Sequence, residues 1–368
     1  MNWPRQVFQR ILHGSMLTLA CFCAAAINAQ TATAERRSTF QAVEAEAKHT
    51  AGQVGAKVSG DTATVPGPSG SGGTIFRETV AIVGTNTNRL LCTGVLIDRD
   101  VVLTAAHCVC AWRGNRNEIV SIGFGRDRAE WSAISRRLIS IDDERTVFFQ
   151  ADQAFCRDYQ INPQRAMFGK DFALLFLQKS DAETKLNFLY GGYEAGDGQR
   201  TFLDHAKQDR NPQEFRSKSY DVAPARIATA ALYLAPSITR LIAVGYGRSD
   251  ADLDNPAGTA ASTGFKLFAP LTIRSKICGH PLDRAQYGCA AGREAVLIDP
   301  VSDTCAGDSG GPVFVLLPDR YFLVGITSRG LAGRSCVKGG IYSLITPDVI
   351  AWMRLHGVTL HSTPYPEQ

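Results

Sequence analysis

The sequence of 368 residues predicts an all-β fold. From Thr79 onward, short apolar runs alternate with turn residues, and no long helical repeat links them. Runs this short predict the antiparallel strands of a barrel or a sandwich. The runs are Val80–Val83, Gly94–Ile97, Val101–Leu103, Phe172–Leu177, Leu241–Val244, Val313–Leu317 and Phe322–Ile326.

The composition bounds the class of protein. With 45% hydrophobic and 20% charged residues, the chain is predicted to be globular, which excludes a disordered or membrane-embedded protein. Its length allows one large domain or two ordinary ones with a substantial core. The net charge of +4 is small, so nucleic acid is not predicted as a partner.

The first residues, 1–29, are predicted to be a secretory signal peptide. Two arginines precede an apolar stretch, which is shorter than a membrane span requires and ends in small residues. Cleavage after Ala29 or after Ala34 satisfies the small-residue requirement, and a lipid anchor on Cys21 is a third interpretation. The protein is therefore predicted to be secreted or periplasmic, without stable membrane insertion.

Three further segments complete the predicted organisation. Residues 30–74 are rich in Ala, Thr, Gly and Ser and are interpreted as a propeptide or flexible leader. The main domain spans 75–357, and 358–368 form a tail. One helix is predicted, near the end of this domain, with Thr346 as its N-cap, Pro347 in its first turn and Gly357 beyond its end. Its predicted inward stripe is Val349, Ile350 and Met353.

Two polar stretches, about 140–168 and 180–221, interrupt the strand pattern. They are interpreted as surface insertions. The alternative is that one of them borders the functional cleft and restricts what enters it.

Three local strings offer the groups that nucleophilic catalysis requires. Ser309 lies in Asp-Ser-Gly-Gly-Pro, a turn-forming string, and a serine hydroxyl needs a neighbouring base to attack. His107, in Thr-Ala-Ala-His-Cys, is the candidate base. Asp171, in Lys-Asp-Phe-Ala-Leu-Leu-Phe, is the candidate carboxylate that orients it.

Together these strings resemble the trypsin/chymotrypsin family of serine proteases over residues 75–357. The resemblance implies two packed six-stranded antiparallel β-barrels with a C-terminal helix, and hydrolysis of peptide bonds by His107, Asp171 and Ser309. It implies an oxyanion hole formed by the N–H groups of Gly307 and Ser309, and neither a cofactor nor a metal. The alternative is a protein of the same fold that binds without turnover.

The resemblance also implies a primary pocket. Asp303, six residues before Ser309, would lie at its base, and Ser328, Gly330 and Gly340 would line it. A buried carboxylate there favours cleavage after Arg or Lys in protein or peptide substrates, and a protein inhibitor is a further expected partner. Arg329 stands where the family usually has an aromatic wall, which predicts a preference for acidic or polar residues upstream of the cut.

In this family a new N-terminus pairs with the aspartate beside the nucleophile, which is Asp308 here. Lys57 and Val58 are the candidate residues on either side of the activating cut. The alternative is that 58–61 is plain linker.

Ten cysteines support export, since an even number in an exported chain suggests disulfides. Cys21 and Cys23 fall in the predicted signal. The resemblance implies Cys92–Cys108, Cys278–Cys289 and Cys305–Cys336. Cys110 and Cys156 are then paired by elimination, and the alternative is two unpaired thiols.

Overall fold

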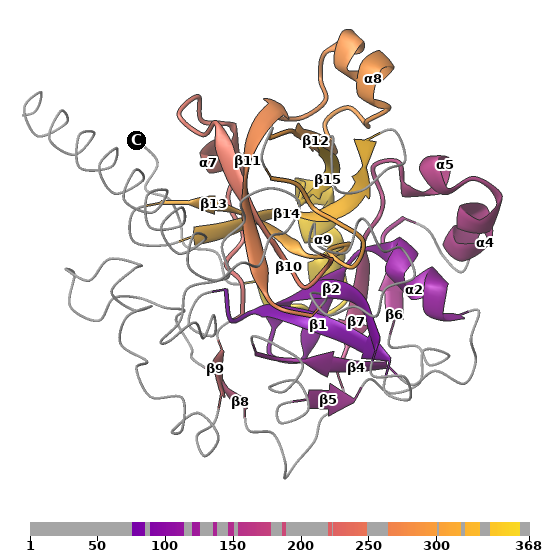
Figure 1. The fold of residues 1–368 in the computed structure, drawn as a ribbon, viewed down its shortest axis with the longest axis vertical. Coiled ribbons are helices and arrows are strands. Elements are labelled where there is room, and N and C mark those ends of the chain that lie inside the picture. The colour runs from indigo at the N-terminus through magenta and orange to yellow at the C-terminus, as the bar shows by residue number, and fades with distance from the viewer. Residues whose placement is uncertain are drawn as a thin grey trace, which may run out of the picture. The chain divides into compact units, whose positions relative to one another are not determined.

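Strands of the first half of the domain form one antiparallel sheet. The computed structural model describes residues 76–84, 89–113, 120–125, 135–137, 146–150, 154–177, 186–188, 220–222, 224–248, 264–299, 302–317, 321–331 and 339–360. The sheet has seven strands in the order β5-β4-β1-β2-β3-β7-β6 (Figure 1). Their bounds are β1 Thr79–Gly84, β2 Arg89–Asp98, β3 Val101–Thr104, β4 Val120–Gly123, β5 Ser135–Arg137, β6 Thr146–Phe148 and β7 Ala173–Phe176.

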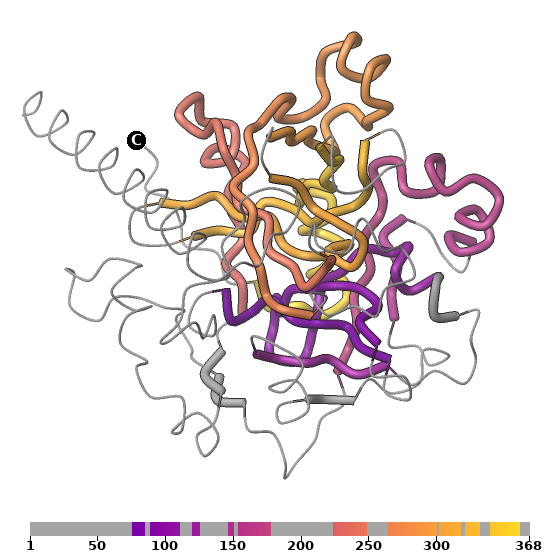
Figure 2. The backbone as a smooth tube through the Cα atoms, viewed as in Figure 1, coloured from indigo at the N-terminus to yellow at the C-terminus, as the bar shows by residue number. Residues whose placement is uncertain are grey.

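Strands of the second half close into a six-stranded barrel in the order β10-β11-β12-β15-β14-β13. They are β10 Arg240–Gly245, β11 Leu267–Ser275, β12 Glu294–Leu297, β13 Pro312–Leu316, β14 Tyr321–Gly330 and β15 Gly340–Leu344. Figure 2 traces this barrel in salmon to yellow, and β1–β4, β6 and β7 of the first sheet in indigo to magenta. A separate parallel pair joins β8 Leu186–Phe188 to β9 Tyr220–Val222.

Six helices connect or cover these strands in the part of the chain that the structure describes. They are α2 Ala106–Arg113, α4 Ala154–Ile161, α5 Pro163–Met167, α7 Ala230–Leu234, α8 Pro281–Tyr287 and α9 Pro347–Leu355. Only α9 was predicted from the sequence, because helices of five to eight residues are too short to show a clear repeat. None of these helices is both long and apolar enough to cross a membrane.

The C-terminal helix starts where it was expected, with Thr346 as N-cap and Pro347 in the first turn. Val349 and Met353 of the predicted inward stripe are buried, and Ile350 packs partly buried against the same core. Trp352, which was not in the predicted stripe, is buried as well and packs against Phe149, with ring centroids 5.3 Å apart. The helix therefore joins the core of the first sheet.

The short strands are held in place because their apolar side chains are buried. All six residues of β1 are buried, so both faces of this strand pack against other elements and it appears as a continuous apolar run in the sequence. One core cluster combines β1–β3 and β7 with α9 and with Phe314 and Ile326 of the barrel. A second cluster fills the barrel interior. Side chains of the two halves therefore pack together, which fixes loops of one half against loops of the other.

The predicted all-β class with two strand systems and a C-terminal helix is confirmed. The first sheet differs in detail, since it has seven strands where six were expected, two of them, β5 and β6, only three residues long. The predicted signal peptide 1–29 and leader 30–74 lie outside the described residues, as does most of 180–221.

Candidate functional site

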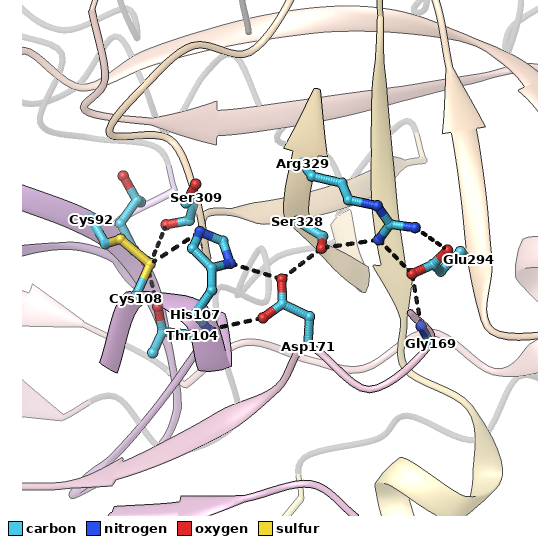
Figure 3. A network of polar contacts seen from close by, with 11 residues as sticks. Cys92, Thr104, His107, Cys108, Gly169, Asp171, Glu294, Ser309, Ser328 and Arg329 are labelled. Carbon is cyan, nitrogen blue, oxygen red and sulfur yellow. Dashed lines mark hydrogen bonds and ion pairs between the residues drawn. A yellow bond between two sulfur atoms is a disulfide. The ribbon is translucent and has the colours of Figure 1, made fainter. Parts of the chain in front are cut away.

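His107 and Asp171 are joined by two hydrogen bonds. His107 lies in the first turn of α2, directly after β3, and Asp171 precedes β7, the neighbour of β3 in the sheet. The ring Nδ1 of His107 lies 2.8 Å from Asp171 Oδ2, and the His107 backbone N–H donates to Oδ1 over 3.0 Å (Figure 3). Two bonds to two carboxylate oxygens fix both the ring and the backbone, so one ring nitrogen is left to face the other way.

The Asp171 carboxylate is fully buried, and a third donor binds it. The hydroxyl of Ser328 donates to Oδ2 over 2.6 Å. Burial by itself would raise the pKa of Asp171, but the charge of the His107 imidazolium and the hydrogen bonds from His107 and Ser328 outweigh it. The pKa of Asp171 is therefore lowered.

Thr93 of β2 holds the loop that carries Ser309. The Thr93 hydroxyl donates to the carbonyl of Gly307 over 2.8 Å, and its N–H donates to the carbonyl of Ser309 over 2.9 Å. The Ser309 carbonyl and His107 Nε2 both lie close to the sulfur of Cys108, at 3.6 and 3.9 Å. Since that sulfur is in a disulfide, these are packing contacts rather than hydrogen bonds. They place Ser309 beside the histidine ring, as Figure 3 shows.

Two N–H groups of this loop remain available. The N–H groups of Asp308, Gly310 and Gly311 all donate to carbonyls. Those of Gly307 and Ser309 have no acceptor among the described residues. Gly307 has a φ of 101°, a conformation that a side chain would oppose, and a Cβ there would lie 2.9 Å from Gly247 Cα. The loop therefore presents two unsatisfied donors next to Ser309, an arrangement suited to an anion.

The sequence model of the Trypsin family matches residues 74–186 and 213–353, well over half of the chain. The chain belongs to the trypsin family. The gap between the matched stretches, 187–212, falls inside the segment that the sequence analysis interpreted as an insertion. A trypsin-like serine protease fold thus accounts for the two strand systems, with His107, Asp171 and Ser309 all inside the matched stretches.

The residues predicted for the pocket of this trypsin-like fold lie together. Gly330 and Gly340 are direct partners across β14 and β15. Asp303 is buried, and its two oxygens accept from the N–H groups of Thr304, at 2.8 Å, and Gly339, at 3.0 Å. Ser328 is on β14 too, but its side chain binds Asp171. The Ser328 hydroxyl is thus part of the His107–Asp171 network.

Asp308 is also buried in this trypsin-like loop. One oxygen accepts from the Gly247 N–H and the other from the Cys305 N–H, both over 2.7 Å. Burial raises the pKa of Asp308 to about 7; the two N–H donors lower it and the nearby charge of Asp303 raises it. Within the described part of the chain no cationic side chain pairs with Asp308. Lys57 and Val58, the predicted activation residues, lie outside that part.

Three predicted disulfides of this trypsin-family chain are present: Cys92–Cys108, Cys110–Cys156 and Cys278–Cys289. Cys305 is also disulfide-bonded, while Cys336, its predicted partner, lies outside the described residues. The sulfurs of Cys92 and Cys108 approach His107 closely enough for a metal site, but bonded sulfurs lack the thiolate charge that metals need.

One aromatic contact at the trypsin-like site was not foreseen. Tyr159 of α4 stacks on the His107 ring, with centroids 5.9 Å apart and planes 20° apart, and Phe155 and Phe148 continue the stack. Because Cys156 ties α4 to α2, part of the predicted 140–168 insertion lies beside His107. The one signal in the sequence was the predicted Cys110–Cys156 bond, which links that stretch to the residues just after His107.

Arg329 does not have the role that the sequence predicted for it. Its guanidinium is buried and bound to Glu294, so its charge does not face a substrate, and the predicted preference for acidic residues upstream of the cut has no basis. Neither Glu294 nor Thr93 was singled out from the sequence. Glu294 belongs to no motif, and its partner is 35 residues away.

Proposed function

We propose that this protein is an exported serine endopeptidase that cleaves protein or peptide substrates after Arg or Lys. The observation that carries the proposal is the doubly bonded His107–Asp171 pair beside Ser309, within a trypsin-family match. A base held by a buried carboxylate next to a serine is the arrangement that nucleophilic hydrolysis needs.

In the proposed reaction, Ser309 Oγ attacks the substrate carbonyl carbon while His107 Nε2 takes its proton. Asp171 keeps the imidazole in the tautomer with hydrogen on Nδ1 and stabilises its charged form. His107 then gives the proton to the leaving amine as the peptide bond breaks, which leaves an acyl-enzyme on Ser309. Water, deprotonated by His107, hydrolyses that ester and restores the hydroxyl.

The N–H groups of Gly307 and Ser309, for which no described residue is an acceptor, support the proposed oxyanion hole. They lie on either side of Asp308, in a loop that Thr93 anchors at both carbonyls. Donors fixed before the reaction stabilise the negative oxygen of the tetrahedral intermediate without further reorganisation, and the loss of one such donor costs about 3–4 kcal/mol of barrier.

The proposed preference for Arg and Lys rests on Asp303, Gly330 and Gly340. Asp303 is buried and accepts a hydrogen bond from the N–H of Gly339, and the next residue, Gly340, pairs with Gly330 across the two strands, so neither glycine adds a side chain beside the carboxylate. A substrate cation would complement the carboxylate, whereas a neutral side chain would leave it without that partner. A protein inhibitor presenting such a residue is a further proposed partner.

Activation is proposed to follow a cut between Lys57 and Val58. The new ammonium would pair with Asp308, a buried carboxylate whose described partners are two N–H groups. The disulfides support the proposed export, because such bonds persist in oxidising compartments.

An active-site serine reagent tests the proposal directly. A fluorophosphonate should label Ser309 in the mature protein, and Ser309→Ala should lose both labelling and more than about a thousandfold of the hydrolysis rate. Ser302→Ala is a matched control, because Ser302 lies in the same segment but donates to Pro270 instead. A folded wild-type chain that binds peptides without labelling would favour the alternative, a protease-fold binding protein.

A further inference from the structure

A buried ion pair lies on the far side of Asp171 from His107 (Figure 3). Arg329 Nη1 and Nη2 donate to Glu294 Oε1 and Oε2 over 2.7 and 2.9 Å, a two-point contact. The side chains are only 4% and 0% exposed. Neither group takes part in the chemistry proposed above.

Glu294 also binds the backbone of the turn that presents Asp171. Its Oε1 accepts from the N–H of Gly169, two residues before Asp171, over 2.8 Å. Gly169 has a φ of 66°, and a Cβ there would lie 2.9 Å from the Cβ of Ala290. The other oxygen, Oε2, accepts from the Ala290 N–H over 2.7 Å. The carboxylate therefore fixes this turn against the segment that follows α8.

Arg329 acts on the opposite side of the aspartate, through its neighbour Ser328. The pairing of β14 with β15 shifts register between Thr327 and Arg329, an irregularity that can re-aim side chains. Ser328 Oγ donates to Asp171 Oδ2, and Arg329 Nη1 lies 3.5 Å from the same Oγ. The donors thus run in one direction, from the guanidinium through the hydroxyl to the carboxylate that holds His107.

Stability alone does not explain such a pair. Burying two charges carries a large desolvation cost, and apolar side chains of similar volume often stabilise a fold as well or better. Apolar side chains would not, however, make directed bonds to the Gly169 N–H or approach Ser328 as a donor. What the ion pair adds is therefore orientation.

We propose that Arg329 and Glu294 are positioning residues for the triad. Glu294 holds the backbone before Asp171, Arg329 holds the hydroxyl that binds its carboxylate, and together they keep His107 oriented toward Ser309. This inference rests on the proposed function, in which His107 is the base.

The test uses the full chain with Arg329→Met and Glu294→Gln combined. This pair of substitutions leaves no buried charge, and glutamine keeps an oxygen for the Gly169 N–H. A control is Asp348→Asn, which breaks the adjacent, partly exposed ion pair, 2.6 Å long, between Arg293 and α9 but leaves the Arg293 side chain in place against Gly169. Arg329→Lys is a milder variant, which keeps the charge but loses the two-point contact.

Misplacement of Asp171 should lower kcat about tenfold to a hundredfold with little change in KM or melting temperature. The acidic limb of kcat/KM against pH should move to lower pH, because the imidazolium is less well stabilised. The low-field proton resonance of the His107–Asp171 hydrogen bond, assigned by its loss in Asp171→Ala, should shift or weaken. The control variant should match the wild type in all three measurements.

A folded double variant with wild-type kcat, pH profile and resonance would overturn the proposal. So would an activity loss that follows only from a lower melting temperature, with the resonance unchanged. If the double variant does not fold, Arg329→Lys decides by the same resonance. Since the resonance needs no turnover, a wild-type chain that labels nowhere and hydrolyses nothing refutes the proposed function separately.

Discussion

The carboxyl group of Asp308 should make the uncut protein less stable as the pH rises from about 4 to about 7. It is buried, two backbone N–H groups bind it, and no cationic side chain among the described residues pairs with it. Burial raises its pKa from 3.8 to about 7. Replacing it by asparagine keeps the shape and one acceptor oxygen but removes the titration.

The sign follows from proton binding. Because the pKa in the folded state is above the ordinary value, the folded chain binds more protons than the unfolded chain between the two. The stabilisation from this extra proton is present below pH 4 and is lost as the pH rises through about 7. A difference of about three pKa units, at about 1.4 kcal/mol each, corresponds to about 4 kcal/mol.

Urea denaturation at a series of pH values measures this contribution. Both proteins carry Ser309→Ala to prevent self-cleavage, and Asp308→Asn should lose about 4 kcal/mol less than the parent between pH 4 and pH 7. Glu78 provides a parallel test, because burial raises its pKa from 4.5 to about 7. Glu78→Gln should therefore remove about 3 kcal/mol of the unfolding free energy that the parent loses over this pH range. If the unfolding free energy depends on pH in the same way with and without Asp308, its carboxyl does not titrate near neutrality and the reasoning is refuted.

Three other variants test the proposed pocket, the proposed activation cut and one disulfide. Asp303→Ser should erase a preference for Arg or Lys over Leu of about a hundredfold or more in kcat/KM while fluorophosphonate labelling persists; equal cleavage after Leu by the unaltered enzyme contradicts it. Lys57→Gln should give an exported, folded, inactive chain; N-terminal sequencing of an active wild-type enzyme that begins near residue 30 or 35 would exclude this cut. Cys110→Ser with Cys156→Ser removes a disulfide that joins residues 46 positions apart, and should lower the free energy of unfolding by about 4 kcal/mol, measured by urea denaturation. An unchanged free energy of unfolding would mean that this disulfide does not stabilise the fold.

The motifs around His107, Asp171 and Ser309 could be predicted from the sequence because each is a local string. The turn at Ser309 requires its glycines wherever it occurs, and β3 and β7 appear as apolar runs because they are buried. The all-β class follows from the same short runs. The short helices α4 and α5 were missed because a few residues do not establish a period.

Contacts between distant segments could not be predicted. The sequence predicts that the Arg329 charge faces the substrate, because nothing near Arg329 in the chain indicates that it forms an ion pair with Glu294. Tyr159 meets His107 only because α4 folds back onto α2, and Thr93 meets the Ser309 loop only because the two halves pack together. Local chemistry therefore determined which groups are present and in what order. The path of the folded chain decided which of them are buried side by side, because burial and pairing depend on proximity in space and not on spacing in sequence.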